Sequence, residues 1–239
     1  PLHAPWIIVT PGDYYENVFI NALPPIVNGW PGGLVLEAET PGSARIFGDP
    51  PIAINTNNVT VRGLVLIAQG ADGIVVNASL SGIDLLFNTI VNPYQTGIIF
   101  YGDIAGSRIE GNVIEPGANG PGTGIHFGWN ATVTAVEILG NHISEPYYDG
   151  ISFDVDRLDG VLIWGNTILN CDRDKDGTGC GILFLSVENL RAVTVENNRL
   201  EGNTSGIIFH DLPSVAGTID TVLVRNNQIF NHRWAQDGN

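Results

Sequence analysis

A short phrase that begins with glycine recurs six times, and it constrains the fold of this 239-residue chain more than any other feature. Each copy reads Gly-Ile-x-Phe or a close variant, and successive glycines lie 24 to 31 residues apart. The copies are Gly73–Val76, Gly97–Phe100, Gly124–Phe127, Gly150–Phe153, Gly181–Phe184 and Gly206–Phe209. Repetition at such a period is typical of solenoids, in which each repeat packs only against its neighbours.

An asparagine marks a second fixed point in each repeat, directly after a short alternating strand such as Val136–Leu139 or Val193–Glu196. The six asparagines are Asn88, Asn112, Asn141, Asn166, Asn198 and Asn227. A buried amide without hydrogen-bond partners costs about 1–3 kcal/mol. We therefore expect stacked amides to bond one another along the axis, as in cross-β ladders, and we interpret these asparagines as scaffold and not as ligand groups.

The two marks predict an all-β, single-stranded parallel β-helix of about seven to nine coils with an asparagine ladder. Coils would stack at roughly 4.8 Å and share one core, into which Ile98 and Phe100 and their counterparts point. The length favours a single domain over residues 1–239. We expect a first coil and cap over residues 1–50, regular coils over 51–230 and a tail over 231–239.

The opening segment Ile7–Val18 resembles the first coil of the right-handed parallel β-helix, or pectin-lyase-like, superfamily, which reads valine-x-proline-glycine-x-tyrosine-x-glutamate. Asn58–Leu66 is similar to its second coil, with Gly63 where later coils place asparagine. The repeats resemble the superfamily's carbohydrate-binding and sugar-hydrolysis type, and the resemblance covers nearly the whole chain. It implies a right-handed helix, but members range from lyases and hydrolases to spikes and adhesins, so function must come from a site.

Charge and composition exclude several classes of partner. The net charge of −15 disfavours nucleic acid and anionic membrane surfaces as partners. The sequence contains no run of 18 apolar residues, so we expect no insertion into a membrane. The chain lacks an initial methionine, which fits a removed leader and a secreted, extracellular protein. No capping helix follows the last coil, so we expect further chain beyond Asn239 or a homo-oligomer.

Cys171 and Cys180 bracket one acidic loop, and their spacing predicts a disulfide in an oxidising compartment. The loop reads Asp-x-Asp-x-Asp-Gly, the first half of a calcium-binding loop of the EF-hand type. The expected calcium ligands are Asp172, Asp174, Asp176 and the carbonyl of Thr178. The bidentate glutamate of such loops is missing, because Leu183 holds its place; a solvated acidic loop with two thiols is the alternative.

In the resembled superfamily, the Gly-Ile-x-Phe strand corresponds to the sheet that carries the substrate cleft. Strand alternation directs a group of polar side chains outward in its middle coils. Asp154 and Asp156 would lie about 6.5–7 Å apart, close to the spacing of acid and base in inverting glycosidases. Asp154, Asp156 and Asp103 are the candidate catalytic residues, with Asp103 as the substitute for either of the others.

Aromatic and imidazole side chains near this face predict the walls of a sugar site, because flat apolar rings can pack against the C–H groups of pyranoses. The candidate substrate-binding residues are His126, Tyr101, Trp129, Tyr147, Tyr148 and His210. Outward-facing Ile99, Leu183, Leu185 and Ile208 instead suggest an apolar partner surface, unless a loop covers them.

These observations favour a secreted glycoside hydrolase acting on a neutral or weakly charged polysaccharide. A non-catalytic glycan-binding, adhesin, spike or filament module is the first alternative. A calcium-dependent polysaccharide lyase with Arg157 as base is the second, although Arg157 could equally form a surface ion pair. The polygalacturonase elements Asn-Thr-Asp and His-Gly and the epimerase element Asp-Pro-His are absent from the sequence.

Overall fold

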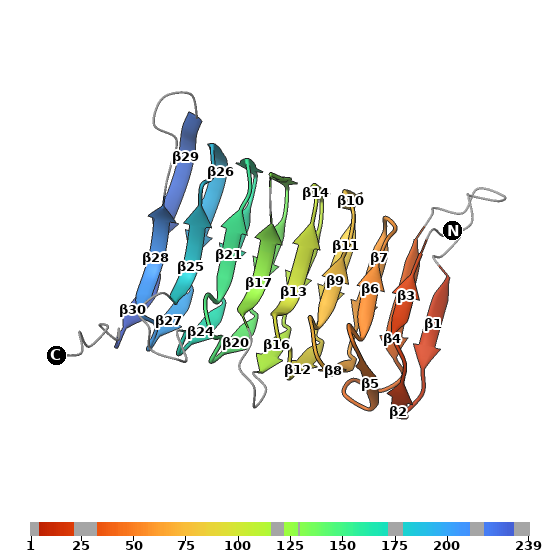
Figure 1. Ribbon diagram of the computed structural model, residues 1–239. Helices are drawn as coiled ribbons and strands as arrows, with labels where there is room; N and C mark the ends of the chain where they lie inside the picture. The colour runs from red at the N-terminus through yellow and green to blue at the C-terminus, as the bar shows by residue number, and fades with distance from the viewer. Residues whose placement is uncertain are drawn as a thin grey trace.

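The computed structural model describes residues 5–21, 33–115, 122–128, 130–171, 179–210 and 218–231. Over these ranges the chain forms 30 β-strands and no helix, and the strands wind into a single stack of coils (Figure 1). No helix in these ranges is therefore long and apolar enough to cross a membrane. The parallel β-helix predicted from the repeats is confirmed.

The strands form three parallel sheets that run the length of the stack. Sheet A has 13 strands: β1 (Trp6–Val9), β4 (Leu34–Ala38), β7 (Val59–Arg62), β10 (Leu80–Ser81), β11 (Ile83–Leu86), β14 (Ile104–Ala105), β15 (Arg108–Glu110), β18 (Thr132–Thr134), β19 (Glu137–Leu139), β22 (Arg157–Asp159), β23 (Leu162–Trp164), β26 (Asn189–Glu196) and β29 (Thr218–Arg225). Four middle coils cross it as two short strands separated by a bend, whereas β26 and β29 each span both positions as a single strand.

Sheet B has nine strands: β2 (Gly12–Tyr15), β5 (Ala44–Gly48), β8 (Val65–Ala68), β12 (Thr89–Val91), β16 (Val113–Glu115), β20 (His142–Ser144), β24 (Thr167–Leu169), β27 (Arg199–Glu201) and β30 (Gln228–Phe230). Sheet C has eight and faces the viewer in Figure 1: β3 (Val18–Ile20), β6 (Ile52–Ile54), β9 (Ile74–Val76), β13 (Thr96–Tyr101), β17 (Thr123–Gly128), β21 (Ile151–Asp154), β25 (Cys180–Leu185) and β28 (Ser205–His210). One strand per coil in sheets B and C agrees with the predicted seven to nine coils.

The turn from sheet A to sheet B, here the A–B turn, carries the asparagine ladder. Asn141 Oδ1 accepts hydrogen bonds from the Asn112 backbone N–H at 2.9 Å and from Asn112 Nδ2 at 3.0 Å. The same pair of bonds links each ladder asparagine to the next, from Asn88 to Asn227. In the coil before Asn88 the ladder place belongs to Leu64, not to Gly63 as the sequence suggested, because the Leu64 N–H donates to Asn88 Oδ1.

The core repeats the side chains of the glycine phrase in columns. Five phenylalanine rings from consecutive strands of sheet C stack with centroids 4.5 to 5.2 Å apart and nearly parallel planes. They are Phe100, Phe127, Phe153, Phe184 and Phe209. The opening glycines are required by close packing, since a Cβ on Gly97 would lie 2.5 Å from the Gly124 carbonyl oxygen and 2.6 Å from Ile114.

Each ladder residue is preceded by a residue in the left-handed backbone region, which reverses the chain direction. Gly63, Gly111, Gly140 and Gly165 hold this place, and Asn197 and Asn226 hold it in later coils. Both residue types tolerate the conformation, whereas another side chain costs roughly 1–2 kcal/mol there. Phe87, with φ 55°, is the exception, and its side chain is 58% exposed.

Candidate functional site

The middle coils of sheet C carry a group of polar side chains on the outward face. One outward column contains Ile99, His126, Ser152 and Leu183 on the adjacent strands β13, β17, β21 and β25. Ile99 is buried, which corrects its predicted place on an exposed aliphatic patch. Leu183, Leu185 and Ile208 are half-buried. The polar pair His126 and Ser152 therefore sits within a largely apolar row.

His126 is fixed by two features of the neighbouring strands. Its Nδ1 lies 2.7 Å from Ser152 Oγ, a hydrogen bond between adjacent coils. Its ring folds over Gly128, where an added Cβ would lie only 2.8 Å from His126 Nε2. Burial lowers the pKa of His126, opposed in part by the negative charge of Asp154. The imidazole is therefore held neutral near pH 7, a form that can accept a proton.

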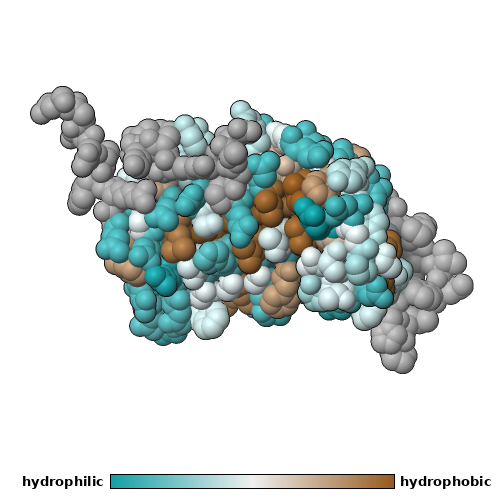
Figure 2. Space-filling view, turned by 90° about the horizontal axis from the view of Figure 1, so that it is seen from below, coloured by the Kyte–Doolittle hydropathy of each residue, from teal (hydrophilic) through white to brown (hydrophobic). Residues whose placement is uncertain are grey.

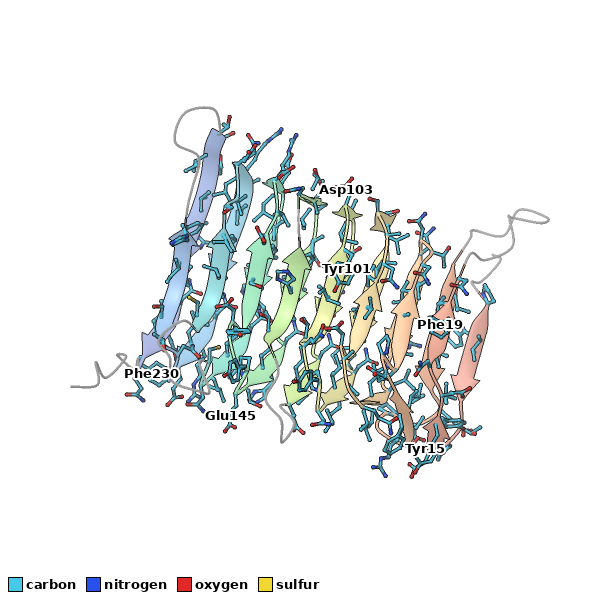
Figure 3. All side chains as sticks on the ribbon, in the orientation of Figure 1. Tyr15, Phe19, Tyr101, Asp103, Glu145 and Phe230 are labelled. Atoms are coloured by element: carbon cyan, nitrogen blue, oxygen red, sulfur yellow. The ribbon has the colours of Figure 1, made fainter. Side chains whose placement is uncertain are left out.

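Tyr101 and Asp154 flank Gly128 along the second outward column. Tyr101 pairs with Gly128 on the next strand, and Asp154 ends strand β21 one coil further on. Figure 3 shows Tyr101 on the open middle of sheet C. Partial burial, with a smaller contribution from the charge of Asp72, raises the pKa of Tyr101, so its hydroxyl stays protonated. Tyr101, His126, Ser152 and Asp154 thus form one cluster around Gly128, here called the central cluster.

Asp103 lies outside this cluster, in the turn from sheet C to sheet A, at the upper edge in Figure 3. Its Oδ1 accepts a 2.7 Å hydrogen bond from the Thr132 backbone N–H, and its own N–H donates to Ser79 Oγ. Asp103 thereby links three coils. It also lines an open groove of about 440 Å³ over sheet A, together with Ser79, Ser81, Thr132 and Thr134.

Asp156 lies in the same turn one coil beyond Thr132. Its side chain is exposed, and its carbonyl oxygen accepts hydrogen bonds from the backbone N–H groups of Glu188 and Asn189. Val155, between Asp154 and Asp156, is buried in the core, so both carboxylates point away from it on the outer side. The structure thus keeps Asp154 and Asp156 on one surface but gives Asp103 a structural hydrogen bond.

Two of the aromatic residues predicted to line a sugar site lie at the turn from sheet B to sheet C, here the B–C turn. Tyr147 and Tyr148 pack edge to face with centroids 5.0 Å apart, and Tyr148 is 47% exposed. Tyr94, two strands of sheet C away, is similarly exposed. His210 is not part of this site, because Leu185 separates it from Asp154 and places it two coils away. Trp129 lies outside the described residues.

Two buried carboxyl groups in the B–C turn escaped sequence reasoning. Asp149 accepts a 2.9 Å hydrogen bond from the Cys180 N–H, and burial raises its pKa to about 6. Asp72 is also buried, with one carboxyl oxygen lacking a hydrogen bond, and burial raises its pKa. Each aspartate directly precedes a repeat glycine, and in two other coils the same position before the glycine is held by Thr96 and Thr123. Polar residues recurring at the position before the repeat glycine were the sequence signal that could have revealed these two carboxyl groups.

The cysteines do not form the predicted disulfide. Cys171 and Cys180 are both buried thiols. Burial raises the pKa of Cys171 well above its ordinary value, and the charge of Asp149 adds to this, so the reactive thiolate is disfavoured. The predicted calcium ligands Asp172, Asp174, Asp176 and Thr178 lie outside the described residues. Within those residues, no group of three or more His, Cys, Asp or Glu side chains could hold a metal ion.

Every arginine in the described ranges forms an ion pair with a carboxylate on the outer surface. Arg157 pairs with Asp159 at 2.7 Å, and Arg191 pairs with the same carboxylate at 3.7 Å. Arg157 therefore forms a surface ion pair, as the alternative to a catalytic base anticipated. A polyanionic ligand would have to displace such pairs before it met an available cation.

Comparison with known proteins agrees with this architecture. A stretch of 96 residues aligns at 30% identity with a cell surface glycoprotein of Methanothermus fervidus; it covers 40% of this chain but only 14% of that protein. A pectin methylesterase from Aspergillus niger superposes over 95% of this chain and 77% of its own, with a TM-score of 0.56 and 12% identity. The PL6 family alginate lyase AlyGC superposes over 94% of this chain and 36% of its own, with a TM-score of 0.55 and 16% identity.

At these identities the two solved structures are evidence of the fold alone. The model of the family described as "Right handed beta helix region" matches residues 52–237, which is more than half of the chain. That match also agrees with the hand expected from the first two coils. With its stacked coils, asparagine ladder and parallel sheets, the chain belongs to the right-handed β-helix family.

Proposed function

We propose that this protein binds a neutral polysaccharide across the outer face of sheet C and hydrolyses it at the central cluster. The supporting observation is the gathering of Tyr101, His126 and Asp154 around Gly128, in a face that is otherwise largely apolar. The exposed tyrosines of the B–C turn extend this surface toward sheet B. Because the arginines of the described ranges are ion-paired, a neutral glycan fits better than a polyuronate.

In this proposal Asp154 and Asp156 supply the general acid and the general base. Only Val155 separates them, just past the end of β21, and extended backbone over two residues spans about 6.5–7 Å, which leaves room for a water molecule as in inverting glycosidases. The neutral imidazole of His126 and the protonated hydroxyl of Tyr101 position sugar hydroxyl groups beside Asp154. Asp103 has no catalytic part, since its carboxylate already accepts the Thr132 N–H.

The test is a screen of neutral and acidic polysaccharides for new reducing ends, with the ultraviolet absorbance of unsaturated lyase products followed in parallel. Hydrolysis releases reducing ends without that absorbance. Asp154→Asn should then lower turnover by about 10²–10⁴-fold, the usual contribution of a positioned acid or base. Asp220→Asn, an exposed aspartate of sheet A, is the matched control and should retain full turnover. Undiminished turnover of Asp154→Asn would refute the assignment.

A non-catalytic glycan-binding module of a cell surface is the second candidate. The engagement of Asp103 in a turn favours it, since this removes one of three candidate carboxylates from chemistry. The surface glycoprotein relative and the predicted secretion support an extracellular location for either candidate. Glycan binding without products from any substrate, and lost on Tyr101→Ala, is the result expected of this second candidate.

We also propose that Asp172, Asp174 and Asp176, with the carbonyl of Thr178, bind calcium. The support is the Asp-x-Asp-x-Asp-Gly spacing alone. Calcium bound only to the folded state at a hundredfold excess over Kd should stabilise it by about 2.7 kcal/mol. A melting temperature that is the same in calcium and in chelator would argue against the metal.

A further inference from the structure

The A–B turn forms a narrow exposed strip on the opposite edge of the helix from sheet C. Its residues all lie in the described ranges. Phe87 stands at one end and Trp164 at the other; Gly111 and Gly140 lie in the coils between them, and Gly165 directly follows Trp164. A Cβ added to Gly140 would meet nothing within 4 Å, and one on Gly165 would meet only a backbone nitrogen at 4.0 Å. The middle of the strip is therefore an open floor of backbone.

Phe87 breaks the rule that the rest of this turn obeys. Its place requires the left-handed backbone region, and every other coil from Gly63 to Asn226 supplies glycine or asparagine there. The ring is 58% exposed, so core burial does not offset the strain. It leans over Gly111, where an added Cβ would lie 2.4 Å from ring Cδ1. A strained and exposed aromatic residue whose ring is held in place by a glycine is better explained by binding than by folding.

Trp164 gives the strip a second aromatic ring. It ends strand β23, directly before Gly165, and is 46% exposed. The register Leu86, Glu110, Leu139, Trp164 puts it three coils from Phe87, about 14 Å along the axis. Two exposed rings are thus separated by a glycine floor, which the half-buried Glu110 and Leu139 border on the side of Trp164. This arrangement suits an extended ligand with flat apolar faces.

The borders of the strip define the polarity of that ligand. On the sheet B side, one outward column contains Thr89, Val113, His142 and Thr167; its two threonines and His142 offer hydroxyl and imidazole groups. On the sheet A side, Glu110 is paired with Arg108 at 3.0 Å, so its charge is already neutralised. Apolar rings at the ends, hydrogen-bonding groups along the side and no unpaired cation together match an uncharged, hydroxyl-rich chain.

We propose that this strip binds an extended neutral glycan whose sugar rings stack on Phe87 and Trp164. Its hydroxyl groups hydrogen-bond to the polar column of sheet B. The site is distinct from the central cluster and does not depend on the function proposed for it. A chain held at the A–B turn would anchor the protein to a polysaccharide while leaving sheet C accessible.

The test measures binding of the whole chain to insoluble cellulose, chitin and β-1,3-glucan and to an array of neutral oligosaccharides. Phe87→Asn introduces the residue found at the equivalent Asn197 and Asn226, and Trp164→Ala removes the second ring. Each should weaken binding about tenfold, as loss of one aromatic contact does. Tyr15→Ala, which removes an exposed aromatic residue of sheet B outside the strip, should leave the affinity unchanged.

Stability separates binding from a structural role. Phe87→Asn relieves the backbone strain, so its melting temperature should equal or exceed that of the wild type. A clear drop in melting temperature would mean that Phe87 serves the fold, and the proposal would be wrong. Binding of the wild type to none of these neutral glycans, or wild-type affinity in both strip variants, would overturn it. So would a dimer that Phe87→Asn dissociates, because the strip would then be a protein interface.

Discussion

Replacement of one ladder asparagine should destabilise the whole helix. Asn141 is 1% exposed, and its side chain makes four hydrogen bonds. Its Oδ1 accepts from the backbone and side chain of Asn112, and its Nδ2 donates to Ile109 O and Asn166 Oδ1. Asn141→Leu keeps the approximate volume but leaves the Asn112 backbone N–H buried and unpaired. At about 0.5–1.5 kcal/mol for each bond, the expected loss is about 2–6 kcal/mol.

Asn227 provides the matched comparison at the end of the ladder. It makes the same bonds to Asn198 and one to Val195 O, but it is only half-buried. Water can therefore replace the lost partners, and Asn227→Leu should cost about 1 kcal/mol or less.

Urea unfolding followed by circular dichroism measures both variants against the wild type. A lower midpoint with an unchanged slope reports a loss of stability without a change in the surface exposed. If Asn141→Leu lies within 0.5 kcal/mol of the wild type, or if Asn227→Leu costs as much, the hydrogen-bond ladder is not what stabilises this turn; the 0.5 kcal/mol threshold is about the scatter of neutral surface substitutions.

Three further predictions concern sheet C and the B–C turn. Gly128→Ala should push the His126 ring off Ser152 and, by exposing it, raise the His126 pKa toward its ordinary value; NMR titration of the imidazole measures this, and an unchanged pKa would contradict the packing. Burial raises the Asp149 pKa from 3.8 to about 6, so the folded state holds this proton more tightly and stability falls as pH rises from about 4 through 6. Asp149→Asn should remove up to about 3 kcal/mol of that pH dependence in urea midpoints; identical pH profiles would disprove the link. In denaturant without reductant, both cysteines should react with a thiol reagent, whereas Cys171 of the native protein should resist. Absence of reaction in denaturant would instead show that the two cysteines form a disulfide.

The central cluster could be predicted in part because strand alternation and coil register are regular. Alternation directs Tyr101, His126 and Asp154 outward, and the alignment of the Gly-Ile-x-Phe phrases in neighbouring coils puts His126 beside Ser152. The role of Asp103 could not be predicted in this way. It depends on a contact with Thr132 in the following coil, and turn geometry between coils is not periodic in the sequence.

The buried groups of the B–C turn show the same limit. The spacing of Cys171 and Cys180 permits a disulfide, but the two residues follow and begin different strands, and their side chains pack as thiols. Asp149 looks like a surface residue on a protein of net charge −15, yet it is buried and bonded to the Cys180 N–H. Burial of a polar side chain at a turn depends on what neighbouring coils place over it.

The sequence by itself determined the scaffold. Every coil must present matching side chains to the next, so the stacking of identical side chains between coils appears in the sequence as a repeat. The phenylalanine column and the asparagine ladder follow from that requirement. Only the tertiary structure decided which polar groups are available for chemistry. Hydrogen bonds between coils engage Asp103, Ser152 and Asp149 and leave Asp156 exposed. These contacts join residues 26 to 31 positions apart, through turns of unequal length.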